Sequence, residues 1–291
     1  RAPPFHGHPG QRLVYASPRY GELDIMVPAY PSQSEKRSEE IAAGLVKRAD
    51  GGVNEVDEGR KLFAHFLWSA AMVVAEGVEN ADTSTAVGDS DMWRVRGERV
   101  LELGAGNNLT TESAALPSII TALAQAAKVT ITDHPSSPAL TGAINFNIAR
   151  NVANRGIGTT VDAQPHEWGA LDTAFARTHR NAYTRIIAAD CFWMASQHEN
   201  LVRTMRWFLD EADPNARVWV VAGFHTGRAI VAGFFETAVR LGMAVERIYE
   251  RDLNAAREDG GEVRRAWAPA REGEGPENRR RWCVVAVLRI A

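Results

Sequence analysis

The stretch that decides the fold runs from Val100 to Leu109 and reads VLELGAGNNL. Its apolar start predicts the end of a buried strand, and Glu102 follows within that strand. Gly104 and Gly106, with Ala105 between them, allow a sharp turn and a close approach of a ligand to the main chain. At the carboxyl end of a strand in an open α/β sheet, such a turn is where ligands bind.

The charge and spacing of this loop indicate which ligand it suits. A dinucleotide fingerprint requires a third glycine where this chain has Leu109, and Glu102 would repel a pyrophosphate. Glu102 suits a ligand with positive charge, such as the amino and sulfonium groups of S-adenosylmethionine. Asp133, at the end of the next predicted strand, can accept two hydrogen bonds from a ribose diol, and His134 follows it. NAD carries the same diol, so Asp133 alone does not discriminate.

Two features weigh against the simpler interpretation of this loop. A bare Gly-x-Gly is most often an ordinary corner between a strand and a helix, with glycines present only for geometry. Here acidic residues flank the loop, and the chain from Val95 onward alternates β-rich runs with helical runs. We therefore predict a cofactor site in a mostly parallel sheet, and for His134 a capping or surface role is the alternative.

The alternation predicts an α/β fold of the Rossmann-like type, with helices on both faces of the sheet. Seven strands are expected at 100–103, 129–132, 159–163, 185–189, 218–222, 245–249 and 282–289. Helices are expected at 62–78, 116–126, 137–151, 199–209 and 229–241. The charged segment 252–281 is expected to be a long surface excursion.

The first 60 residues are expected to form an extension before a catalytic domain at 61–291. Residues 1–11 are rich in proline, glycine and histidine and are predicted to be disordered, and 13–30 to form short strands. Residues 31–60 are predicted to be a mobile arm with one helix at 34–47. The helix predicted at 62–78 has a clear apolar face and carries Trp68 near its middle.

Composition excludes several classes of function. The chain has 291 residues and a formal net charge of −3, which predicts no general attraction to nucleic acid or to a membrane. Its only two cysteines, Cys191 and Cys283, lie in apolar stretches, so we expect buried thiols and no metal site. No apolar run is long enough to span a bilayer, and a cytoplasmic protein is expected. The sequence does not indicate an oligomeric state.

Four stretches carry a resemblance to a known family: VYASPRYGELDI, KLFAHFLWSA, RVLELGAG with ALPSI and VTITDHP, and ADCFWMASQHENL. VAGFHTGR and VERIYERD add weaker support. Together they resemble the fungal nicotinamide N-methyltransferase-like enzymes, grouped with the lysine methyltransferases of methyltransferase family 16. The resemblance implies S-adenosylmethionine as cofactor and a seven-stranded sheet in the order 3-2-1-4-5-7-6, with a reversed last strand.

The resemblance also implies roles for particular residues. Three of them, Glu102, Gly104 and Gly106, would line the methionine end of the cofactor, with Ala105 between the glycines. The remaining implied contacts are Asp133 at the ribose, Trp168 beside the adenine, Trp68 at the pocket wall and Asp190 beside the transferred methyl group. Core packing is an equal alternative for Trp68, since it lies on an apolar helix. The insertion NNLTTESA, which follows Gly106, interrupts the pattern of the family.

The catalytic candidates are Asp190, Trp193 and His225, which follow the fourth and fifth strands. Asp190 can attract an ammonium group, and the aromatic side chains, Phe192 included, can form the wall of a pocket. Trp193 stands at the aromatic position of the protein-lysine pattern and would narrow a lysine channel. We therefore favour N-methylation of a small amine. The alternatives are methylation of a protein lysine or N-terminus, and a binding protein that has lost the chemistry; a nicotinamide-dependent oxidoreductase is weaker.

Overall fold

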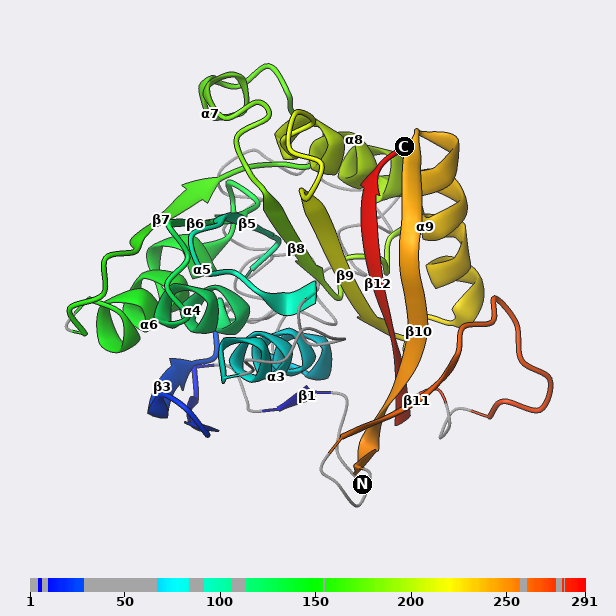
Figure 1. The fold of residues 1–291 in the computed structure, drawn as a ribbon, viewed down its shortest axis with the longest axis horizontal. Coiled ribbons are helices and arrows are strands. Elements are labelled where there is room, and N and C mark those ends of the chain that lie inside the picture. The colour runs from blue at the N-terminus through cyan, green and yellow to red at the C-terminus, as the bar shows by residue number, and fades with distance from the viewer. Residues whose placement is uncertain are drawn as a thin grey trace, which may run out of the picture.

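The computed structural model describes residues 5–6, 10–28, 67–83, 92–105, 114–153, 155–256, 261–275, 279 and 281–291. Within these residues a twisted eight-stranded sheet lies between two helical layers (Figure 1). Its strand order is β11-β10-β12-β9-β8-β5-β6-β7. The predicted Rossmann-like architecture with a mostly parallel sheet is confirmed.

The parallel part of the sheet consists of five strands. Their bounds are β5 Arg99–Leu103, β6 Lys128–Asp133, β7 Thr160–Pro165, β8 Arg185–Ala189 and β9 Arg217–Gly223. These five strands pair in parallel with one another, and most of their side chains other than those of β7 are buried. Near-continuous β-branched and apolar runs are typical of strands covered on both faces. The carboxyl ends of all five strands therefore meet along one edge of the sheet.

The antiparallel end of the sheet differs from the prediction. The strand expected at 245–249 is the long β10, Met243–Ala256, and it pairs with β12, Trp282–Ile290. Within the expected surface excursion lies an eighth strand, β11, Glu262–Ala266, which pairs with β10. Alternating exposure and frequent arginine weaken the apolar signal of β11, because it lies at the edge of the sheet.

A buried charge cluster holds this end of the chain in place. Glu250 of β10 is fully buried and accepts hydrogen bonds from Arg228, at 2.7 and 2.8 Å, and from Arg265, at 2.6 Å. Arg228 also binds Glu274 at 2.8 Å, and its guanidinium lies 3.9 Å from the ring centroid of Phe224. These contacts tie the segment after β11 to the start of α9. They could not be predicted from the sequence, because this segment has no apolar periodicity.

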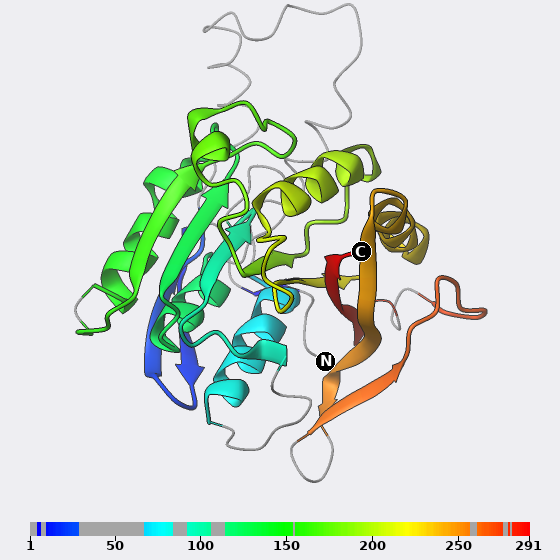
Figure 2. The same cartoon turned by 45° about the horizontal axis from the view of Figure 1, so that its top comes forward.

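The helices lie on both faces of the sheet (Figures 1 and 2). One face carries α3 Ser69–Thr83, α4 Leu116–Leu123, α5 Pro138–Thr141 and α6 Ala143–Asn151. The other carries α7 Ala174–Thr178, α8 His198–Phe208 and α9 Arg228–Arg240. The single helix expected at 137–151 is interrupted at Gly142, where φ and ψ are −108° and −100°. The short α7 was not predicted, because five residues show no helical period.

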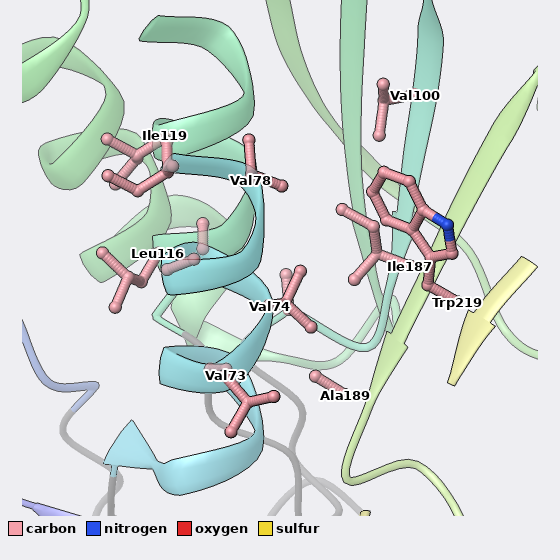
Figure 3. Packing of buried hydrophobic residues seen from close by; sticks show 14 of the residues in the cluster. Val73, Val74, Val78, Val100, Leu116, Ile119, Ile187, Ala189 and Trp219 are labelled. Carbon is pink, nitrogen blue, oxygen red and sulfur yellow. The ribbon is translucent and has the colours of Figure 1, made fainter. Parts of the chain in front are cut away.

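Helix α3 is central to its layer. Figure 3 shows Val74 beside Ile187 and Trp219 of the sheet, while Leu116 and Ile119 of α4 lie on the opposite side of the helix. The predicted start of this helix is wrong. Leu67–Trp68 is a short strand, β4, paired with β1, Phe5–His6, and the helix begins at Ser69. Trp68 therefore precedes α3 instead of lying near its middle, and residues 62–66 lie outside the described part.

The N-terminal strands form a hairpin of β2, Arg12–Ser17, and β3, Gly21–Met26. Asn147 and Asn151, one turn apart on α6, each receive a hydrogen bond from and donate one to the backbone of β3, at 2.7 to 3.1 Å. The two amides thus replace a neighbouring strand along the edge of β3. Both strands lie largely within the stretch 13–30, where short strands were expected, and β3 packs against α6. The predicted arm at 31–60, with its helix, lies outside the described residues, while β1 falls within the stretch expected to be disordered.

The packing of α3 yields a stability test. A Cβ atom on Gly77 would lie 2.7 Å from Cδ2 and Cε2 of the Trp93 indole, which is buried and packs edge-on against Trp219. We expect Gly77→Ala to lower the free energy of unfolding by about 1–3 kcal/mol through overpacking, although alanine is the better helix former.

The matched control is Gly233→Ala in α9, where an added Cβ meets no atom within 4 Å. Helix propensity alone should make this variant about 0.5–1 kcal/mol more stable. Urea unfolding of both variants gives the comparison. Equal changes in the free energy of unfolding for the two variants would show that the contact with Trp93 does not determine the stability of Gly77→Ala.

Candidate functional site

The glycine loop begins at the carboxyl end of β5. Glu102 is buried, and its Oε2 accepts a hydrogen bond from the backbone N–H of Ser118 at 3.1 Å and another from the Ser118 hydroxyl. Ser118 lies in the first turn of α4, where backbone N–H groups lack partners within the helix. Glu102 therefore joins the loop to the N-terminus of α4.

Gly104 and Ala105 make the turn after β5. Gly104 has a φ of +71°, in the left-handed region that favours glycine. The Ala105 N–H donates to the carbonyl of Thr132 in β6 at 3.0 Å, and its own carbonyl accepts from Ala115 at 3.2 Å. The loop thus begins close to the end of β6. Gly106 and most of the NNLTTESA insertion lie outside the described residues.

Asp133, the last residue of β6, is the second carboxyl group at this edge. Its Oδ1 accepts a hydrogen bond from the His134 N–H at 2.8 Å. Its Oδ2 is buried and accepts no hydrogen bond in the described part of the chain. Burial is the main cause that raises the pKa of Asp133 to about 8; the charge of Glu102 acts in the same direction, and hydrogen bonds from Ser137 and from the His134 N–H act against it. A buried acceptor without a donor is costly, so this atom suits a ligand that donates hydroxyl groups.

The residues after β7 lie beside Asp133. The N–H of His166 donates to the Asp133 carbonyl at 2.7 Å, and Trp168, two residues later, is 8% exposed and packs into the core under α8. His134 is partly exposed, with its Nδ1 2.9 Å from the Ser136 hydroxyl and its Nε2 3.9 Å from a carboxylate oxygen of Glu167. The structure thus brings Asp133, His134 and the segment around Trp168 together.

Asp190 follows β8 and connects three elements. It is buried, and its φ of +55° is unusual for a residue other than glycine. Its Oδ1 accepts from the Gly223 N–H at the end of β9 at 2.8 Å, and the carboxylate also accepts from the Ala70 N–H in the first turn of α3. Burial raises the pKa of Asp190, against the lowering effect of His225 and of these two N–H groups. Asp190 thus caps α3.

A narrow cavity lies beside this carboxylate. Its lining includes Asp190, Gly223, His225 and Trp282, together with the first residues of α3, and its volume of about 10 Å³ is close to that of one water-sized probe. Burial lowers the pKa of His225, while the charge of Asp190 raises it. The predicted pair of Asp190 and His225 is therefore brought together at the ends of β8 and β9.

The aromatic residues after Asp190 do not line this cavity. Phe192 is fully buried and stacks on Phe234 of α9 with ring centroids 3.8 Å apart, so it belongs to the core rather than to a pocket wall. Trp193 is half-buried and packs against the same cluster. Its Nε1 has no hydrogen-bond partner in the described part. The prediction that Phe192 and Trp193 form the wall of the acceptor pocket is not supported by these contacts.

Sequence reasoning missed several residues of this edge. Ser118 lies within the ALPSI motif, and a serine in the first turn of a helix is a recognisable partner for a carboxylate. Trp282 and Cys283 line the cavity from β12, and Arg279 precedes that strand. Only the topology, which inserts β12 between β9 and β10, brings them there. Among the described residues, no cluster could hold a metal ion, and no helix is long and apolar enough to cross a membrane.

Comparison with known proteins supplies the family. The sequence profile of the lysine methyltransferase family, methyltransferase family 16, matches residues 52–238, more than half of the chain. The narrower resemblance to nicotinamide N-methyltransferases is not shown by these comparisons.

Two relatives agree with this assignment. A relative named protein N-terminal and lysine N-methyltransferase EFM7 from Gibberella zeae is 32% identical, covering 66% of this chain and 70% of its own. The protein of the same name from Schizosaccharomyces pombe is 28% identical, covering 65% and 68%. A solved TehB-like SAM-dependent methyltransferase from Corynebacterium glutamicum covers 90% of this chain and 100% of its own at 12% identity and a TM-score of 0.47. The chain belongs to the lysine methyltransferase family and is an S-adenosylmethionine-dependent methyltransferase.

Proposed function

We propose that the protein transfers a methyl group to an amine of another protein, at its N-terminus or at a lysine side chain. The sequence favoured a small amine, but the relatives that cover two thirds of this chain are named as protein N-terminal and lysine methyltransferases. The observation that carries the proposal is the buried carboxylate of Asp190 beside a narrow cavity.

The shape and charge of the cavity support an amine at the end of a chain. A volume of about 10 Å³ leaves no room for an enclosed aromatic ring, whereas an ammonium group is about the size of a water molecule. Burial raises the pKa of Asp190, and only His225 and two neutral N–H donors act against this effect, so an entering cation would favour the ionised carboxylate. The remainder of the substrate would stay outside the cavity.

The residues at the carboxyl ends of β5 and β6 fit S-adenosylmethionine. We propose that the orphaned Oδ2 of Asp133 accepts the ribose hydroxyl groups, and that Gly104 and Ala105 let the methionine end approach the main chain. Trp168 would flank the adenine. When bound, the cofactor supplies an activated methyl group, so the protein chiefly has to orient the acceptor and exclude water. Roles for Trp68 and Gly106 stay predictions from the sequence.

Substitution of Asp133 tests the cofactor site. We expect Asp133→Ala to fold and to bind S-adenosylmethionine at least tenfold more weakly, because bound ribose hydroxyl groups would stabilise the carboxylate form, and a hydrogen bond to a charged group contributes about 1.5–3 kcal/mol. Isothermal titration calorimetry measures the affinity, and circular dichroism checks the fold. NAD serves as the ligand control and should bind weakly to both proteins. An unchanged affinity in the folded variant would exclude Asp133 from the site.

The same carboxyl group predicts a pH dependence of stability. Since the pKa of Asp133 is raised from 3.8 to about 8 in the folded protein, the folded state favours the protonated form. This contribution to stability is present below about pH 4 and is lost as the pH rises towards 8. Without cofactor, the Tm of the wild type should therefore fall relative to that of Asp133→Asn between pH 5 and 8. Parallel Tm curves for the two proteins would contradict the raised pKa.

Labelled donor identifies the acceptor class. Purified enzyme is incubated with a cell lysate and S-adenosylmethionine carrying a tritiated methyl group, and proteins are separated from small molecules. We expect the label in protein, and mass spectrometry of the labelled chains should place it on an N-terminal or lysine nitrogen. Asp133→Ala at equal concentration controls for other methyltransferases in the lysate. Label recovered only in small molecules would restore the small-amine prediction, and no label above the control would favour a binding protein.

A further inference from the structure

We propose that His225 is the proton acceptor for the incoming ammonium group, with Asp190 as its charge partner and Gly223 as the residue that makes room for its ring. This inference rests on the proposed amine acceptor. It concerns a step that the cofactor does not perform, because only a neutral amine has a lone pair for the methyl group. The N–H bond of the ammonium breaks, an N–H bond forms on the imidazole, and the freed electron pair stays on the amine nitrogen.

The geometry around Gly223 carries this inference. A Cβ atom on Gly223 would lie 2.9 Å from His225 Nδ1 and 3.8 Å from Asp190 Oδ1. Both polar atoms therefore flank one point, on the wall of the cavity where the acceptor is proposed to enter. Gly223 has no positive φ among the described glycines, so its backbone does not require glycine. Glycine is required here because the imidazole of His225 takes the space that a Cβ atom would need.

The surroundings suit a base that is neutral at the start. Burial lowers the pKa of His225, which keeps the ring free of a proton, and the charge of Asp190 raises it and would stabilise the imidazolium once formed. The other ionisable groups on the described lining are Cys283 of β12, whose pKa burial raises to about 12, and Arg279. The first residues of α3 on the lining, Ser69 and Ala70, are uncharged. Asp190 is thus the only carboxyl group on the described lining.

The alternative is that His225 only fills space, and the shape of the pH profile separates the two. With a proton acceptor, kcat/KM for a peptide amine should be nearly flat above the pKa of His225, because the ammonium form is used. In His225→Gln only amine that is already neutral can react. For a lysine peptide, whose amine has a pKa of about 10.4, we therefore expect kcat/KM to fall at least 100-fold at pH 7 and to rise about tenfold per pH unit below the pKa of the amine.

Two glycine variants and a histidine control accompany this measurement. Gly223→Ala should displace the imidazole and reproduce the sloping profile, while leaving the affinity for S-adenosylmethionine unchanged. Gly158→Ala, where an added Cβ meets no atom within 4 Å, and His179→Gln, in the cluster around Phe175, should keep the flat profile. A flat profile in His225→Gln, even at reduced rate, would overturn the proposal.

A second measurement needs no methyl transfer. NMR titration of the cofactor-free protein, with His225 assigned by its absence in His225→Gln, gives the pKa of the imidazole directly. Asp190→Asn keeps one oxygen acceptor, which can still receive the Gly223 N–H, but removes the charge, so the pKa of His225 should fall further. An unchanged midpoint would show that the two groups are not coupled. Failure of the protein-amine proposal would appear instead as label in small molecules, with this coupling intact.

Discussion

Three buried carboxylates at the carboxyl ends of neighbouring parallel strands set the main constraint on this structure. Glu102 lies one residue before the end of β5, Asp133 ends β6 and Asp190 follows β8, and these three strands are adjacent in the sheet. Buried charge is costly unless it is compensated, and backbone N–H groups that follow the strands or open a helix supply donors here. Glu102 binds the first turn of α4 and Asp190 that of α3, so the site and the helical layer depend on the same contacts.

The three carboxyl groups differ in how many hydrogen bonds they can still accept, and this difference distinguishes the cofactor side of the site from the side of the methyl acceptor. Glu102 is occupied by Ser118, whereas Asp133 keeps one buried oxygen without a donor. Asp190 is bound by neutral N–H groups and faces His225, so its charge is only partly compensated. We therefore propose that Asp133 binds the hydroxyl groups of the cofactor and that Asp190 binds the cationic methyl acceptor. A donor and an acceptor held on neighbouring strands can meet without any rearrangement of the sheet.

Much of the fold could be predicted from the sequence because its signals are local. Four of the five parallel strands are largely apolar or β-branched runs, and Glu102, Asp133 and Asp190 each stand where such a run ends. Trp68 could not be placed, because the apolar period of α3 continues backwards through β4, and pairing with β1 ends the helix there. Phe192 and the lining from β12 depend on which strands become neighbours, and no local pattern encodes that. Even so, His225 could be selected from its position after a strand alone.

A crystal structure of the enzyme with S-adenosylhomocysteine and a peptide that presents its amine tests the account most directly. The account predicts the amine nitrogen in the cavity between Asp190 and His225, within hydrogen-bond distance of at least one of them. It also predicts the ribose hydroxyl groups on Asp133 Oδ2. An amine bound elsewhere, for example against Trp193 with the cavity at Asp190 closed, would contradict the central claim.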